Sequence, residues 1–301
     1  MDDYVAAFLA ASTYAETTKT SYRYALSRLG EFLAGKGLTI DDLTGPLFLQ
    51  WVNGQGWGNN MRRLGSYAVR AFVLWLGHGR EHPVFAIKPP RDNAAPGRAL
   101  DIAALRSLME SFDLSKPIGW RNLAIVAVMA DTGLRASEVC RLEVIKVNMI
   151  ARRFTVLVKR DRWQEKIFCA ETAKVLAVWL AHREKIAQPR VKTVFVSVGG
   201  LHRGLPLTRD GLKVEFAKFG DRAKIGHISP HDMRRTMAVL LTEAGAPTRM
   251  AQELGGWEDL RTFQRYTQTL RPGQIDQYSA AEKLLKQLFE AKAPDDRTTV
   301  L

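Results

Sequence analysis

Apolar residues in the first ninety positions recur at the three- and four-residue spacing of amphipathic helices. In segment 17–37 these positions are Tyr22, Ala25, Leu26, Leu29, Phe32 and Leu33. A short helix is expected at 46–53, and Asn59 or Asn60 is the expected N-cap of another. That helix carries an apolar face of Leu64, Tyr67, Ala68, Ala71, Leu74 and Trp75. The pattern predicts a bundle of three to five helices over residues 1–85.

A proline-rich segment follows this bundle. Residues 83–98 hold four prolines and a glycine. The adjacent pair Pro89 and Pro90 excludes a helix and favours extended chain. We therefore expect an interdomain linker at residues 86–98, with a surface loop inside a single domain as the alternative.

Beyond the linker, helical periodicity dominates but is interrupted by two segments of alternating polar and apolar residues. The alternating segments, 153–160 and 163–170, surround Asp161 and predict a β-hairpin. Helices are expected at 101–112, 119–131, 135–142, 171–186, 208–224, 229–245 and 275–291, with a short strand at 194–198. The region 99–291 is thus predicted to be mainly α-helical with a small antiparallel sheet. Residues 292–301 are predicted to be a disordered tail.

The length and charge of the chain narrow the class of protein. The 301 residues are enough for two domains, and 44 basic against 31 acidic residues give a net charge of +13. Such an excess favours a polyanionic partner, with nucleic acid ahead of an anionic membrane surface. Two cysteines, Cys140 and Cys169, make no disulfide framework, and no apolar stretch approaches the ~20 residues of a membrane span. We expect a cytoplasmic protein without membrane association.

Two pairs of residues, each spaced by three, could bind an anion. Arg135 and Glu138 would share one helical face, where a carboxylate could orient a guanidinium toward phosphate; a surface ion pair is the alternative. His231 and Arg234 would lie just inside a helix N-terminus, where the helix dipole favours negative charge. A capping or core histidine is the alternative there. His227 and His231 lack a third ligand at a suitable spacing, so no metal site is predicted.

Three further residues complete the candidate chemistry. Lys159 ends the first predicted strand, where a hairpin tip could bring its ammonium group to a leaving oxygen; a solvated lysine is the alternative. Trp257 follows a glycine pair and carries an indole N–H that could donate to phosphate, although tryptophan is more often a core residue. Tyr266, nine residues later in a basic segment, is the candidate nucleophile, with Tyr278 as its rival.

The order of these residues resembles a known family. The segments TGLRASEVCRL, VFVSVGGLHRGLPLT, SPHDMRRTMAVLLTEAGAPTRMAQELGGW and RTFQRYT are similar, in that order, to the catalytic domain of the tyrosine recombinases, the phage integrase family. The resemblance covers roughly residues 100–285. It implies a helical, SAM-like core-binding domain at 1–85 and a catalytic domain at 99–291, which together form a C-shaped clamp around duplex DNA.

The resemblance also implies roles for the matched residues. Arg135 and Arg234 would bind the scissile phosphate. Tyr266 would attack it and leave a 3′-phosphotyrosine and a free 5′-hydroxyl. Lys159 would protonate the leaving 5′ oxygen as general acid. His231 would contact the phosphate and assist proton transfer.

Three further positions can be compared with the family pattern. Trp257 stands where many members have a second histidine, and Glu138 matches a supporting acidic position. The glycines that usually surround the hairpin lysine are missing around Lys159, which leaves Lys166 as an alternative general acid. Because covalent attachment of DNA conserves the bond energy, neither a metal nor another cofactor is expected.

The function expected from the resemblance is site-specific recombination through a Holliday junction, in integration, excision or dimer resolution. The implied partners are duplex DNA with short inverted-repeat core sites, a homotetramer formed on DNA from free monomers, and accessory DNA-bending proteins. Helix 275–291 would dock into a neighbouring subunit, with packing on its own domain as the alternative, and the enzyme would associate with the nucleoid. The candidate DNA contacts in the first domain are Arg62, Arg63 and Arg70. The alternatives are a type IB topoisomerase-like enzyme, a DNA-binding accessory protein without catalytic turnover and, more distantly, a membrane-surface binder.

Overall fold

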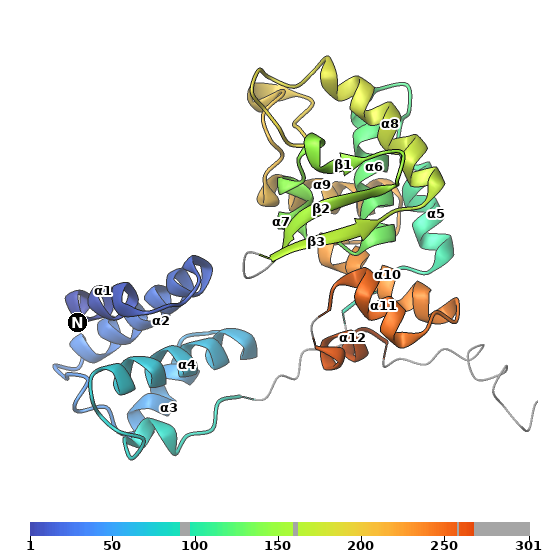
Figure 1. Ribbon diagram of the computed structural model, residues 1–301. Coiled ribbons are helices and arrows are strands. Elements are labelled where there is room, and N and C mark those ends of the chain that lie inside the picture. Colours follow the sequence, from blue (N-terminus) through green and yellow to red (C-terminus); the bar gives the residue numbers. More distant parts are fainter. Residues whose placement is uncertain (91–96, 159–161, 258, 268–301) are drawn as a thin grey trace, which may run out of the picture. The chain divides into compact units, whose positions relative to one another are not determined.

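The chain forms two compact units, Met1–Ala95 and Pro96–Leu301. The computed structural model drawn in Figure 1 describes residues 1–90, 97–158, 162–257 and 259–267. The side chains of Thr262 and of residues 265–267 are outside that description. Each unit has a hydrophobic core of its own.

The first unit is a helical bundle, as the apolar spacing predicts. Its helices are α1 (Asp2–Ala11), α2 (Glu16–Ala34), α3 (Gly45–Gly54) and α4 (Asn59–Trp75). Helix α2 packs along α4, α1 packs on α2, and α3 packs against α4 (Figure 1). The expected cap of α4 is wrong by one residue. Gly58 is the last extended residue and forms the N-cap, so Asn59 and Asn60 are already helical.

The second unit is mainly helical with one small sheet, which confirms the predicted class. Its helices are α5 (Ile102–Glu110), α6 (Pro117–Thr132), α7 (Ala136–Arg141), α8 (Ala170–Glu184), α9 (Arg209–Arg222), α10 (Pro230–Glu243), α11 (Thr248–Gly255) and α12 (Leu260–Thr267). The expected start of α10 is correct, because Ser229 is its N-cap and Pro230 its first residue. The predicted helix 275–291 and tail 292–301 lie outside the described residues.

The sheet is antiparallel, in the order β1 (Val147–Asn148), β2 (Arg153–Val158), β3 (Arg162–Ile167). Strands β2 and β3 form the predicted hairpin, in a register that pairs Val158 with Arg162. Strand β1 was not predicted, since two residues are too few to show alternation. The predicted strand at 194–198 is wrong. That segment makes only the single bridge Val196–Pro206. The Ser197 N–H donates to the Leu205 carbonyl and the Leu207 N–H to the Phe195 carbonyl, so the pairing is too short to form a strand.

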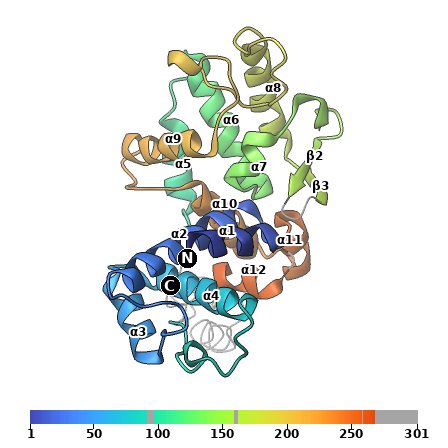
Figure 2. The ribbon, with the colours of Figure 1, turned by 90° about the vertical axis from the view of Figure 1, so that its left-hand side faces the viewer.

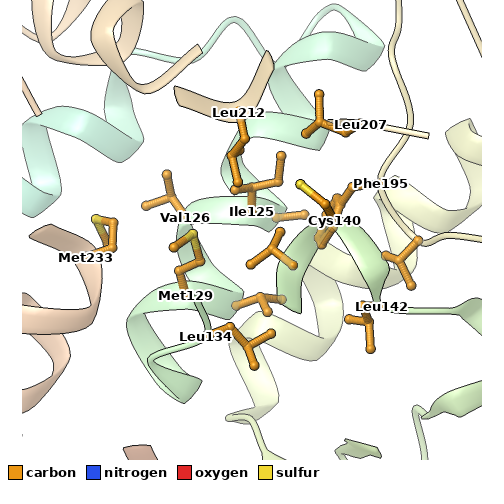
Figure 3. Close-up of a cluster of buried hydrophobic side chains, with 14 of the residues drawn as sticks. Ile125, Val126, Met129, Leu134, Cys140, Leu142, Phe195, Leu207, Leu212 and Met233 are labelled. Carbon is orange, nitrogen blue, oxygen red and sulfur yellow. The ribbon is translucent and has the colours of Figure 1, made fainter. Parts of the chain in front are cut away.

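Helix α6 is the centre of the second unit. Its Ile125, Val126 and Met129 are fully buried and meet side chains of other segments, including Leu212 of α9 and Met233 of α10 (Figure 3). Apolar residues on all sides are typical of a helix enclosed by other elements. Because α6 is enclosed in this way, it supports the segment that follows it, residues 133–135.

None of the helices in the described part of the chain has the length and apolarity that a bilayer span requires.

A smaller core holds the last three described helices together. It consists of Met237, Ala238, Ala251, Trp257 and Phe263. Helices α11 and α12 both pack against α10, and Figure 2 shows the three together at one end of the unit. Residues 248–267 thus depend for their position on one face of α10.

A buried ion pair links α6 to α9. Arg121 is 3% exposed, and its guanidinium donates to the carboxylate of Glu215 and to the side-chain oxygen of Asn122. Burial lowers the pKa of Arg121, while the Glu215 carboxylate opposes that shift. Removing only one partner would leave the other charge uncompensated in the interior.

We expect Glu215→Ala to destabilise the contact between α6 and α9 by about 3 kcal/mol, because Arg121 would lose its counter-charge. Hydrogen exchange of the α6 amides in the full chain measures this loss. The control is Lys218→Ala. Lys218 forms an exposed ion pair with the same Glu215, so its removal should cost less than about 1 kcal/mol. Equal losses in the two variants would contradict a buried role for the Arg121–Glu215 pair.

Candidate active site

A cavity of about 550 Å³ opens where α7, α9 and the N-terminus of α10 meet. Its described lining residues are Arg135, Ala136, Ser137, Arg209, Lys213, His227, Ile228, Ser229, Pro230, His231 and Arg234. Four of these side chains are arginine or lysine, two are histidine, and none of those described is acidic. Such a lining attracts an anion, and the free N–H groups at the start of α10 add to that attraction.

Arg234 is almost completely enclosed, with 2% of its surface exposed. Its guanidinium donates to the carbonyl oxygen of Gly133 and lies over the Trp257 ring, 4.5 Å from the centroid. Gly133 ends α6 in the left-handed region at φ +61°, and a Cβ there would lie 3.1 Å from the sulfur of Met237. Glycine at this position therefore allows the carbonyl to meet the arginine.

Arg135 is held by its predicted partner Glu138. The carboxylate accepts from Arg135 Nη1 and from the Arg135 backbone N–H, both at 2.7 Å. The Glu138 side chain is only 5% exposed, whereas that of Arg135 is 41% exposed. One buried carboxylate thus orients the arginine while other N–H donors of the same guanidinium remain on the cavity side.

His231 follows directly after the capped start of α10. The carboxylate of Asp232 accepts from the Ser229 hydroxyl and from the Ser229 backbone N–H, both at 2.8 Å. The pKa of His231 lies below its usual range because of desolvation and because Arg235 and Arg234 oppose a further positive charge. His231 is therefore neutral near pH 7, with one nitrogen able to donate and one able to accept a hydrogen bond.

The two lysine candidates differ in what can be said of them. Lys159 lies outside the described residues. Lys166 is 2% exposed, and its Nζ donates to the Leu254 carbonyl at 2.5 Å. Burial, together with the nearby charges of Arg234 and Arg135, lowers the pKa of Lys166 to about 7, and the Glu138 carboxylate opposes this shift. Lys166 is absent from the described lining of the cavity.

Trp257 follows α11, and Tyr266 belongs to α12. Trp257 is 4% exposed and packs on Phe263, with the ring centroids 5.1 Å apart. It lines a separate hollow of about 470 Å³ next to β3 and α11. Tyr266 is a residue of α12, three positions after Phe263, and its side chain lies outside the described part. Packing of Phe263 thus sets the position of the helix that contains Tyr266.

Among the cationic and histidine residues of the described cavity wall, three were not singled out as binding residues from the sequence: Arg209, Lys213 and His227. Arg209 and Lys213 are four apart in α9, directly after the cap Thr208, whose hydroxyl accepts from the Gly211 N–H at 3.0 Å. That spacing puts both on one helical face, which was a usable signal. Nothing in the sequence indicates that this face meets α7 and α10.

The three arginines proposed as DNA contacts in the first unit have different surroundings. Arg70 donates to the carbonyls of Phe85 and Ile87 and lies over the Phe85 ring. These contacts give Arg70 a structural role in holding residues 83–87 against α4. Arg63 lies 5.8 Å from the centroid of Tyr67, and Arg62 is half-buried. Their contacts with DNA stay predictions.

The sequence matches the phage integrase family over residues 98–271, which is more than half of the chain. Among its relatives is the tyrosine recombinase XerC of Vibrio cholerae serotype O1, 26% identical over 260 residues that span 83% of this chain and 81% of the relative. XerC of Actinobacillus pleuropneumoniae serotype 7 is 26% identical over 258 residues, spanning 83% and 82%. The chain belongs to the phage integrase family. It is an enzyme of the tyrosine recombinase class, whose members cleave and rejoin DNA in site-specific recombination.

Solved structures share the fold. The XerH recombinase in its post-cleavage complex with a palindromic difH substrate matches with a TM-score of 0.74 at 16% identity, over 88% of this chain and 80% of that one. The Tn1549 transposon integrase in complex with transposon right end DNA gives a TM-score of 0.71 at 17% identity, over 95% and 98%. The architecture is therefore preserved where little sequence identity remains.

We expect the unfolding free energy of the wild type, relative to Lys166→Met, to rise between about pH 7 and pH 10.5. The pKa of Lys166 is about 7 in the folded chain and 10.5 ordinarily, so the unfolded state binds more protons in this window. The burial penalty is fully present below pH 7 and disappears as the pH approaches 10.5. Denaturant unfolding of both proteins at a series of pH values measures it. A constant difference across the window would contradict the shifted pKa.

Proposed function

We propose that this recombinase cleaves one DNA strand at a time with Tyr266 as the nucleophile. The tyrosine oxygen forms a bond to the scissile phosphorus while the bond from phosphorus to the 5′ oxygen breaks. The products are a 3′-phosphotyrosine and a 5′-hydroxyl, and rejoining reverses these steps on a partner strand. The observation that supports this function is the cationic cavity, in which two separately anchored arginines meet one helix N-terminus.

In this proposal, Arg135 and Arg234 bind the nonbridging oxygens of the scissile phosphate. Attack on the phosphate increases the negative charge on those oxygens, and donors already held in place stabilise that charge without reorganising. The bonds of Arg135 to Glu138 and of Arg234 to Gly133 supply this preorganisation. His231, neutral near pH 7, donates to the phosphate or accepts the proton of the nucleophile. Trp257 supports Arg234 by stacking on its guanidinium.

We propose Lys159 as the general acid that protonates the leaving 5′ oxygen. The surroundings of the alternative, Lys166, favour this choice. The Lys166 amine is buried and donates to a backbone carbonyl, and it is absent from the described cavity wall. A proton donor must come within hydrogen-bond reach of the leaving oxygen, and the contacts of Lys166 do not suit it to that role.

The proposed substrate is duplex DNA with short inverted-repeat core sites, to which both units would bind. Four subunits would assemble on two sites and exchange strands through a Holliday junction, with accessory DNA-bending proteins where the sites require them. Arg209 and Lys213 would contact phosphates beside the scissile one, and Arg62, Arg63 and Arg70 would contribute from the first unit. The enzyme would accordingly associate with the nucleoid.

Tyr266→Phe is expected to abolish covalent capture of DNA, because it removes the attacking oxygen. The test is incubation with nicked duplex fragments from the source genome, denaturation in SDS, and sequencing of the DNA that remains attached. The matched control, Tyr278→Phe, should be captured as well as the wild type. Capture of Tyr266→Phe would overturn the assignment. Binding of DNA without capture of any protein would favour the accessory-protein alternative.

Replacing Arg209 or Lys213 by alanine is expected to weaken binding of duplex DNA and to lower its salt dependence. Each lost phosphate contact reduces the slope of log K against log salt concentration by about 0.9. Gel-shift titration at several salt concentrations measures the slope. Lys174→Ala is the control, because that lysine is exposed on α8 and paired with Glu171. An unchanged slope in Arg209→Ala and Lys213→Ala would remove α9 from the proposed interface.

A further inference from the structure

Helix α11 ends in a turn that leaves one carbonyl for a partner from elsewhere. The Trp257 N–H donates to the Gln252 carbonyl and the Gly256 N–H to the Glu253 carbonyl, both at 3.0 Å, with Gly256 left-handed at φ +67°. This pattern is a Schellman motif, and it satisfies two of the terminal carbonyls of the helix. The next carbonyl, that of Leu254, accepts from Lys166 Nζ at 2.5 Å.

Strand β3 contacts this turn at two points on one face. Lys166 and Gln164 are two residues apart, so their side chains lie on the same side of the strand. Gln164 packs so closely against Gly256 that a Cβ there would lie 2.2 Å from its side-chain oxygen. A cation near the C-terminus of a helix is also favoured by the helix dipole. Strand β3 thus holds the end of α11 by one charged and one steric contact.

The residue that follows this turn is Trp257. Its ring covers the Arg234 guanidinium at 4.5 Å and packs on Phe263 of α12 at 5.1 Å. A shift of the turn would therefore move the aromatic surface under Arg234 and the helix that contains Tyr266.

The charges of the described residues around Lys166 are unbalanced. Arg234 of α10 and Arg135 of α7 both disfavour its positive charge, Glu138 of α7 favours it, and α11 presents only a backbone carbonyl. Among the described residues, two cations and one carboxylate therefore act on this buried ammonium. The same two arginines line the cavity. An anion bound between them would compensate the excess and favour the charged amine.

We propose that Lys166 is a positioning residue that caps α11 and holds Trp257 against Arg234. Its ammonium group would bind the Leu254 carbonyl more firmly when phosphate occupies the cavity. Binding of the substrate phosphate would thus strengthen the contacts that hold the Trp257 ring against Arg234. The inference rests on the proposed function of the cavity as a phosphate site. It gives Lys166 a role distinct from that of a general acid, since its amine acts on α11 and not on the DNA.

The decisive measurement is the titration of Lys166 in the full chain labelled with ¹³C-lysine. Its side-chain NMR signal is followed from about pH 5 to about pH 11, a range that brackets its pKa of about 7, with and without millimolar inorganic phosphate at constant ionic strength. Phosphate is expected to raise the pKa of Lys166 by about one unit, because an opposite charge nearby favours the ammonium form. The exposed Lys174 serves as an internal reference, and its titration should not move. A purely structural lysine would show no dependence on phosphate.

The remaining outcomes separate this inference from the proposed function. If phosphate moves the arginine Nε signals of the cavity but leaves the Lys166 titration unchanged, the inference is overturned and the phosphate site stands. If phosphate moves neither, both are overturned.

A variant tests the positioning role directly. Lys166→Met is expected to lower the rate of covalent capture at saturating DNA by about 10- to 100-fold, as misplacement of a reacting group does, with DNA affinity nearly unchanged. Lys166→Arg, which retains a charge, should recover part of the rate, and Lys174→Met should match the wild type. A folded Lys166→Met with the wild-type rate would overturn the role. If Lys166→Met fails to fold, the titration of the unaltered protein decides alone.

Discussion

The burial of the Arg234 guanidinium is the constraint on which the rest of the site depends. A cation with 2% exposure is stable only where its donors are used and its faces are covered. The Gly133 carbonyl at the end of α6 accepts from this guanidinium, and the Trp257 ring after α11 covers it. Three parts of the second unit, the end of α6, helix α10 and the turn after α11, must therefore be in place before Arg234 can face the cavity.

The second feature of the site is its excess of positive charge. The described cavity wall has no acidic side chain, and the nearby carboxylates are occupied in positioning: Glu138 holds Arg135, and Asp232 caps α10. This arrangement is unfavourable for the empty protein and favourable for a bound phosphate. The lowered pKa values of His231 and Lys166 arise from burial together with the same excess. In the proposed mechanism, recognition of the anion and stabilisation of the reacting phosphate thus have one electrostatic origin.

Much of the secondary structure could be predicted because it leaves a periodic trace in the sequence. The four-helix bundle, the β2–β3 hairpin and the start of α10 at Ser229 and Pro230 all follow local rules of spacing and capping. The predicted strand at 194–198 was wrong because a short apolar run shows burial without showing which secondary structure it adopts. Segment 194–198 is a short, valine-rich apolar run of which Val194, Phe195 and Val196 are buried, yet it makes a single bridge, because its backbone pairs with residues 205–207 over too short a length to form a strand. Apolar runs do not reveal what covers them.

The sequence by itself determined the residue pairs that lie within one helical turn, because their geometry depends only on spacing. Arg135 with Glu138 is such a pair. The sequence also placed Arg234 correctly within the helix that begins after Ser229. Only the tertiary structure decided that Lys166 meets the Leu254 carbonyl 88 residues away, and that Arg209 and Lys213 face the same cavity as Arg135. Such contacts join elements through packing of their apolar faces, so no local pattern in the chain records which polar side chains are brought together.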